Sequence, residues 1–144
     1  MEKTSLSAGN VIYKILAGNE AVTGKATKVF PVAADNAILP YVAYRRSRME
    51  QTAEKGRANP YPASPDSPYQ SRGRVGADTV YVEVNCYGAT YAESVELAEA
   101  VRGALDGARY ESDGLVMRGC MLSESQEYYE DDAYVQELVF KVRI

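Results

Sequence analysis

The sequence predicts an α+β fold, with a mainly antiparallel sheet of about five strands and two helices packed on one face. Three observations predict it. A run with strand periodicity over residues 80–86 leads through a capped turn into an amphipathic helix. Another amphipathic helix opens the chain, and two strand-like segments around an acidic turn close it. The predicted order is helix, two strands, a long loop, strand, helix and two strands, in a single domain over residues 1–144.

The first predicted helix runs from Ser5 to Ala17. Its apolar residues recur at helical spacing, and they are Leu6, Val11, Ile12, Ile15 and Leu16. Gly18 follows directly, where a glycine commonly ends a helix. Residues 18–27 are polar and predict a connection without regular structure.

Two strands follow this connection. Val29 to Val32 is short, and Pro31 within it predicts an edge strand or a bulge because proline cannot donate to a ladder. Residues 34–37 predict a turn, and Ile38 to Met49 predicts the next strand. Pro40 lies near the start of that strand, where a missing N–H is tolerated.

A long proline-rich loop then covers about residues 51–76. It holds four of the six prolines of the chain, and loops of this length are uncommon in compact domains unless they serve a function. It also contains Tyr61 and Tyr69, two aromatic residues that a plain linker would not need.

The most informative segment is Val80 to Gly107. Apolar residues alternate with polar ones up to Cys86, which predicts a strand with one buried face. Thr90 and Glu93 have the spacing of a capping box, and Gly107 lies where a helix C-cap glycine is expected. The positions that recur at helical spacing are Ala92, Val95, Ala98, Val101 or Arg102, and Leu105.

The last two predicted strands form a hairpin. They run from Leu115 to Tyr128 and from Ala133 to Ile144, around a turn with three consecutive acidic residues. In the final strand, alternate apolar residues predict the buried face, and they are Leu138, Phe140, Val142 and Ile144.

Charge is unevenly distributed along the chain. The net charge of −4 argues against nucleic-acid binding as the main activity. Residues 44–74, the basic segment, carry seven basic and three acidic side chains, which leaves −8 on the rest. This asymmetry is typical of a chain that packs against its own copies or an acidic partner, and the alternative is a solvated loop. The predicted subunit-interface residues are Arg45, Arg46, Arg48, Arg57, Tyr61, Tyr69, Arg72 and Arg74. A regular strand would turn Arg46 and Arg48 to one face and Arg45 to the other.

The residue types for most catalytic sites are missing. The chain has no histidine, which excludes histidine-based triads, and it has no glycine-rich phosphate loop. Cys86 and Cys120 are predicted to be buried, reduced thiols. Five acidic residues could in principle bind a hard cation, but they lack the alternation of a calcium loop and predict a solvated turn. They are Glu124, Glu127, Glu130, Asp131 and Asp132. Tyr128 and Tyr129 could stack on a ligand, although cross-strand packing is the more common role. We therefore expect no catalytic, cofactor-binding or metal-binding residues.

Nothing in the sequence predicts a membrane segment. No run of about 18 apolar residues exists. The N-terminus also lacks the long apolar stretch of a secretory signal.

Two segments carry a resemblance to a known family. KVFPVAADNAILPYVAYRRS, residues 28–47, followed after a loop by VYVEVNCYGATYAESVELAEAVRGALDG, residues 80–107, resembles the tail-completion or tail-terminator proteins of long-tailed phages and prophages. The matching positions are Pro31, Leu39, Pro40, Tyr44, Val84, Tyr87, Tyr91, Ala92, Leu97, Ala98, Val101, Arg102 and Leu105. The match covers nearly the whole chain, and the matching residues are positions at which side chains pack together in the fold. The proline-rich loop is longer and more basic than the short connection that the family pattern has at this place.

The resemblance implies a small α+β protein that joins a ring, commonly a hexamer, at the head-proximal end of the tail tube. The ring stops tube growth, and the filled head docks on it. The implied partners are other copies of this chain, the tail tube protein and a head-completion or connector protein, while DNA passes through the lumen without specific binding. The implied location is the virion neck, after assembly in the bacterial cytoplasm.

Three alternatives remain open on the residues alone. One is another phage neck, adaptor or minor structural protein. Another is a small-molecule binding module whose tyrosines line a pocket. The third is an enzyme that uses only carboxylates, such as Glu124 with Glu127, which would need two carboxyls with separated pKa values in a cleft.

Overall fold

The computed structural model describes residues 3–51, 78–112 and 114–144. The helices are α1 (Ala8–Ala17), preceded by a 3-10 turn (Ser5–Ser7), α2 (Glu20–Thr23) and α3 (Tyr91–Leu105). The strands are β1 (Val29–Pro31), β2 (Tyr41–Gln51), β3 (Asp78–Gly88), β4 (Tyr110–Ser112), β5 (Leu115–Met117), β6 (Gly119–Glu130) and β7 (Ala133–Arg143).

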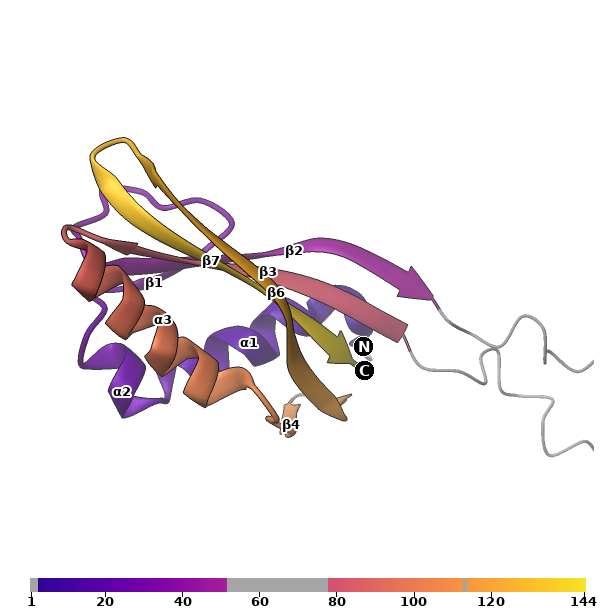
Figure 1. Ribbon diagram of the computed structural model, residues 1–144. Coiled ribbons are helices and arrows are strands. Elements are labelled where there is room, and N and C mark those ends of the chain that lie inside the picture. Colours follow the sequence, from indigo (N-terminus) through magenta and orange to yellow (C-terminus); the bar gives the residue numbers. More distant parts are fainter. Residues whose placement is uncertain (1–2, 52–77, 113) are drawn as a thin grey trace, which may run out of the picture.

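The predicted α+β class is confirmed. Five strands form one sheet in the order β1-β2-β3-β7-β6, and β4 pairs with β5 in a small second sheet. β1 runs parallel to β2, whereas the other neighbours in the main sheet are antiparallel. The helices lie together on one face of the main sheet (Figure 1). Among the described residues, no helix covers the other face of the main sheet.

The core lies between the helices and the main sheet. Alternate residues of β3 and β7 point into it, as the alternating pattern predicts, and Phe140 is the largest fully buried side chain. Fully buried side chains from the helices meet them, and they are Ile12, Leu16, Leu97, Val101 and Leu105.

The junction of β3 and α3 is built as the sequence predicts. The Thr90 hydroxyl accepts a hydrogen bond from the Glu93 amide at 3.1 Å. The Glu93 carboxylate reaches back to the amide of Ala89 at 2.7 Å, one residue earlier than in a standard capping box. Gly107 follows the helix with a φ of +84°, a left-handed conformation that favours glycine.

Two predictions in the first half are wrong in detail. The polar connection contains helix α2, because the Asn19 side chain accepts a hydrogen bond from the Val22 amide and caps a short helix there. β2 begins at Tyr41 rather than Ile38. The Thr27 hydroxyl donates to the carbonyls of Ile38 and Pro40, which holds this segment outside the ladder.

Two predictions in the second half also need correction. The segment predicted as one strand from Leu115 is divided, because β5 pairs with the preceding β4 and β6 begins only at Gly119. On α3, Ala92 is exposed whereas Ser94 is fully buried. A Cβ at Gly88 would lie 2.6 Å from the Ser94 amide. The helix therefore packs closely on the end of β3 at Ser94, and Ser94 instead of Ala92 belongs to its buried face.

Candidate interaction surface

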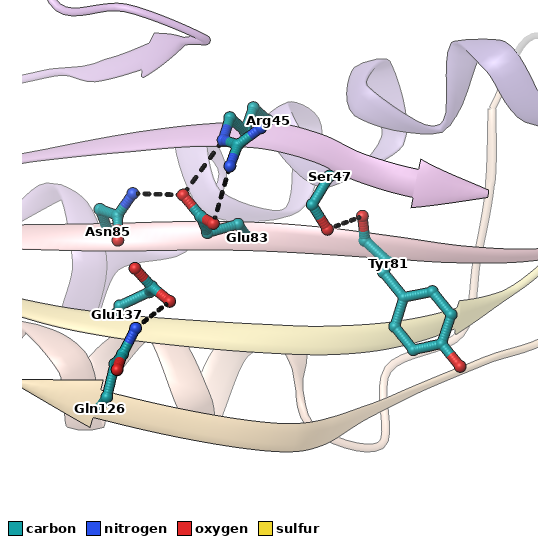
Figure 2. A network of polar contacts seen from close by, with 7 residues as sticks. All are labelled: Arg45, Ser47, Tyr81, Glu83, Asn85, Gln126 and Glu137. Atoms are coloured by element: carbon teal, nitrogen blue, oxygen red, sulfur yellow. Dashed lines mark hydrogen bonds and ion pairs between the residues drawn. The ribbon is translucent and has the colours of Figure 1, made fainter.

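The face of the main sheet that points away from the helices is the candidate interaction surface, and we call it the outer face. Its side chains come from β2, β3, β7 and β6 at the positions between the core residues. Polar and charged side chains occupy its middle (Figure 2). Aromatic side chains occupy the end near the β6–β7 turn.

A hydrogen-bonded network crosses the middle of the outer face. The Arg45 guanidinium donates to both carboxylate oxygens of Glu83, each at 3.1 Å, and the Asn85 amide donates to Glu83 at 3.0 Å. Figure 2 shows this group beside a second pair, in which Gln126 donates to Glu137 at 2.8 Å. The hydrogen bonds and the negative charge of Glu83 raise the pKa of Arg45, so this cation is held in place within the chain.

A bulge changes which arginines share a face. Arg46 pairs with Val82 and Arg48 with Tyr81, so Ser47 is the extra residue. Arg48 therefore lies on the outer face with Arg45, and Arg46 points to the opposite side. The predicted grouping of Arg46 with Arg48 is wrong because that prediction assumed an unbroken alternation.

Each of these arginines has a partner within the chain. Arg48 stacks on the Tyr81 ring, 3.9 Å from guanidinium carbon to ring centroid, and pairs with Glu50 at 2.9 Å. Arg46 donates to the Leu6 carbonyl at 3.3 Å. Arg45, Arg46 and Arg48 consequently form no single anion-binding cluster. The other predicted interface residues, Arg57, Tyr61, Tyr69, Arg72 and Arg74, lie outside the described residues.

The aromatic end of the outer face is built from stacked rings. Tyr41 stacks on Tyr87 with 4.4 Å between ring centroids, and Phe30 meets Tyr41 edge-on at 5.7 Å. Burial, followed by the nearby Tyr128 and Tyr41, raises the pKa of Tyr87 to about 12. These rings pack on one another across the strands and form an apolar patch at this end of the outer face. The raised pKa keeps the phenol of Tyr87 neutral.

The acidic cluster does not form a catalytic pair. Glu124 pairs with Val139 on the outer face, whereas Glu127 pairs with Gln136 and faces the helix side. Glu127 accepts hydrogen bonds from the Tyr91 hydroxyl at 2.9 Å and from Gln136 at 3.2 Å. Among the described residues, no group of three or more histidine, cysteine, aspartate or glutamate side chains could hold a metal ion. The geometry therefore gives the carboxylate-enzyme alternative no support.

Two smaller predictions, on cross-strand tyrosine packing and on the cysteines, are confirmed. Tyr129 packs against Tyr134 on the neighbouring strand with 4.9 Å between centroids, as cross-strand aromatic packing requires. Cys86 and Cys120 are buried free thiols. Burial raises the pKa of both, to about 12 for Cys120. Within the described ranges, no helix has the length and apolar character to cross a membrane.

The comparisons with known proteins show the fold. No protein-family model matches the chain, and no curated protein matches it. Chains of solved structures do match. One of them belongs to a structure described as the virion of a native gene transfer agent particle, with a TM-score of 0.62 and 17% sequence identity. The match covers 92% of this chain and 90% of that chain, so the two share a fold over nearly their whole length.

Proposed function

We propose that this chain is a structural protein of a tailed virion or virion-like particle, without enzymatic activity. In this proposal it closes the head-proximal end of the tail tube as a ring of identical copies and joins the tail to the head. Its partners are then the tail tube protein and a head-completion or connector protein. DNA passes through the ring without being specifically bound.

The observation that carries the proposal is the shared fold with a chain of a gene transfer agent virion over 92% of this chain. It agrees with the resemblance to tail-terminator proteins that residues 28–47 and 80–107 carry. One line of support uses the three-dimensional fold, and the other uses the residues of these two segments.

The chemistry of the surface is compatible with this role. The described residues offer neither a metal cluster nor a paired-carboxylate site, and the polar side chains of the outer face bind one another. A net charge of −4 suits a wall past which DNA must slide, because a negatively charged lumen repels phosphates.

Deletion of the gene from a particle-producing cell tests the proposal. We expect tails of abnormal length and heads without tails in electron micrographs, and plasmid-borne wild-type protein restores joined particles. A tagged chain labelled with gold should mark the head-proximal end of the tail.

Two outcomes distinguish the alternatives. Label at the head-proximal end with tails of normal length would identify another neck or adaptor protein instead of a terminator. Normal, joined particles that lack the chain would contradict a structural role in the virion.

A further inference from the structure

The outer face carries a charge pattern along β7 that is complementary to itself. The side chains that β7 contributes to this face are, in chain order, Val135, Glu137, Val139, Lys141 and Arg143. Val139 is the midpoint of this row. Glu137 comes two residues before it and Lys141 two residues after it. The row is therefore acidic on one side of Val139 and basic on the other.

The ends of the outer face extend this pattern. At one end the β6–β7 turn adds Glu130, Asp131 and Asp132, and Figure 1 shows this turn rising away from the helices. At the opposite end Lys141 and Arg143 are exposed. Among the described residues, no carboxylate forms an ion pair with either of these two cations. The outer face thus has an acidic end and a basic end whose cations can bind a partner.

The middle of the outer face is nearly balanced within each chain. Arg45, Glu83, Val139 and Glu124 lie side by side across β2, β3, β7 and β6. The first two bind each other through two hydrogen bonds, and Val139 is apolar and half-buried. Glu124 is the exception, because no described cation forms an ion pair with it. A second copy can approach this row without separating the Arg45–Glu83 pair.

A two-fold axis over Val139 brings opposite charges together. The axis lies between two facing sheets and runs perpendicular to their strands, so it places β7 of one copy over β7 of the other in the reverse direction. Glu137 of each copy then faces Lys141 of the other, because both lie two residues from the axis. Arg143 of each copy lies toward the acidic turn of the other. Every contact occurs twice, as in any isologous interface.

The outer face is large enough for such a pair. Four strands of eleven or twelve residues form it. At a strand spacing of about 4.8 Å and a rise of about 3.3 Å per residue, it covers roughly 700 Å² in each copy. Two copies would bury roughly 1,400 Å², which lies within the range of about 1,200–2,000 Å² for specific interfaces.

We propose that two copies of this chain pair face to face through the outer faces of their main sheets, related by a two-fold axis at Val139. Two reciprocal contacts between Glu137 and Lys141 fix the register of the pair. This inference goes beyond the proposed ring, because a two-fold contact closes at two copies and cannot build a ring. It describes a separate contact, through which two copies meet.

A charge exchange tests the register. The Glu137→Lys and Lys141→Glu variants should each dimerise about tenfold more weakly than the wild type in sedimentation at low salt, because like charges then face each other. An equimolar mixture of the two variants should dimerise like the wild type, since each copy supplies the charge that the other lacks. Glu137 also accepts a hydrogen bond from Gln126. Recovery in the mixture separates the charge effect from the loss of this bond, which the mixture does not restore.

Matched variants carry the same charge changes away from the outer face. Glu96→Lys on the exposed side of α3 and Lys25→Glu after α2 should leave dimerisation unchanged. Circular dichroism should show the wild-type fold for all four variants.

Glu124 gives a prediction of the opposite sign. The axis places Glu124 of each copy opposite Glu124 of the other, because this residue lies level with Val139. Glu124→Gln should therefore strengthen dimerisation. Glu127→Gln removes the same charge on the helix side of β6 and should not.

A single cysteine on the axis tests the geometry. Val139→Cys treated with a short bis-maleimide should give a covalent dimer, because the two cysteines face each other. Ser125→Cys is the control, since Ser125 is exposed but pairs with the core residue Leu138 and so faces the helix side. It should give no covalent dimer. The native thiols are buried and should not contribute.

Three results would overturn the face-to-face pairing. They are a wild-type chain that stays monomeric at high concentration and low salt, variants that dimerise no better mixed than alone, and a dimer that Val139→Cys does not cross-link. These measurements use the purified chain, whereas gene deletion and gold labelling use whole particles. Failure of the pairing therefore leaves the proposed function standing, and a dimer from a chain that is missing from the tail neck would contradict only the proposed function.

Discussion

At the scale of single residues, the outer face depends on a few well-placed polar contacts. The side chain of Arg45 is 48% exposed, whereas that of Glu83 is 15% exposed, so their two-bond contact is only partly shielded from water. Exposed ion pairs contribute little because solvent screens them, but bidentate geometry is the favourable case.

A double-mutant cycle on Arg45→Ala and Glu83→Ala measures this contact. We expect a coupling free energy of about 0.5–1 kcal/mol in urea unfolding at low salt. Arg45→Lys should recover only part of this coupling free energy, because an ammonium group cannot donate to both carboxylate oxygens with the planar, two-bond geometry of a guanidinium. A coupling near zero would mean that the pair is fully screened.

The partly buried phenol of Tyr87 predicts that stability depends on pH at the alkaline end. Its pKa is raised to about 12 in the folded chain, while an unfolded tyrosine titrates near 10. Between these pH values the unfolded chain binds fewer protons than the folded chain. The contribution of Tyr87 to stability is therefore fully present below about pH 10 and is lost as the pH rises toward about 12. Tyr87→Phe keeps the stacked ring and should make this decline shallower in thermal melts. Equal slopes for the two proteins would contradict the assignment.

At the scale of elements, the junction of β3 and α3 is tightly constrained. A Cβ on Gly88 would lie 2.6 Å from the Ser94 amide and 3.0 Å from its Cα, and both are backbone atoms that cannot move alone. Two residues after this glycine, Thr90 caps α3. The strand and the helix are therefore locked together at this point.

Two substitutions separate these effects. Gly88→Ala should destabilise the fold by about 1–3 kcal/mol, as overpacking does, and should shift the position of α3. Thr90→Ala should cost about 1 kcal/mol, and Thr90→Ser should restore most of it by retaining the capping oxygen. Denaturant midpoints measure both. A neutral Gly88→Ala would show that β3 and α3 can separate freely.

At the scale of the whole molecule, the proposed assembly depends on the charge asymmetry of the chain. Attraction between exposed charges falls off over a Debye length of about 8 Å at physiological salt. Self-association should therefore weaken steadily as salt increases, while the unfolding midpoint of the monomer changes much less.

Charge reversal on the basic side tests this directly. Replacement of Arg45, Arg46 and Arg57 by Glu should abolish ring formation and tail capping. Circular dichroism must first show an intact fold, since Arg45 also binds Glu83. The matched control reverses Arg102, Arg109 and Arg118 on the acidic half and should leave association in place. Sedimentation across salt concentrations measures both triple variants. If the triple variant of Arg45, Arg46 and Arg57 associates as well as the control variant, the basic side is solvated and takes no part in the contact.

The sequence by itself determined the parts of the fold that depend on a few neighbouring residues. The alternation from Val80 to Cys86, the capping pair Thr90 and Glu93, and the glycine at position 107 each have a local physical cause, so each could be predicted. The residue types also determined that histidine chemistry is excluded and that one part of the chain is basic.

Only the tertiary structure decided which side chains meet. The bulge at Ser47 exists because β2 pairs with β3 in a particular register, and it places Arg48 beside Arg45. The separation of Glu124 from Glu127 likewise follows from the pairing of β6 with β7. Such features could not be predicted from the sequence, because strand register is set by partners distant along the chain and a one-residue shift exchanges the two faces of a strand.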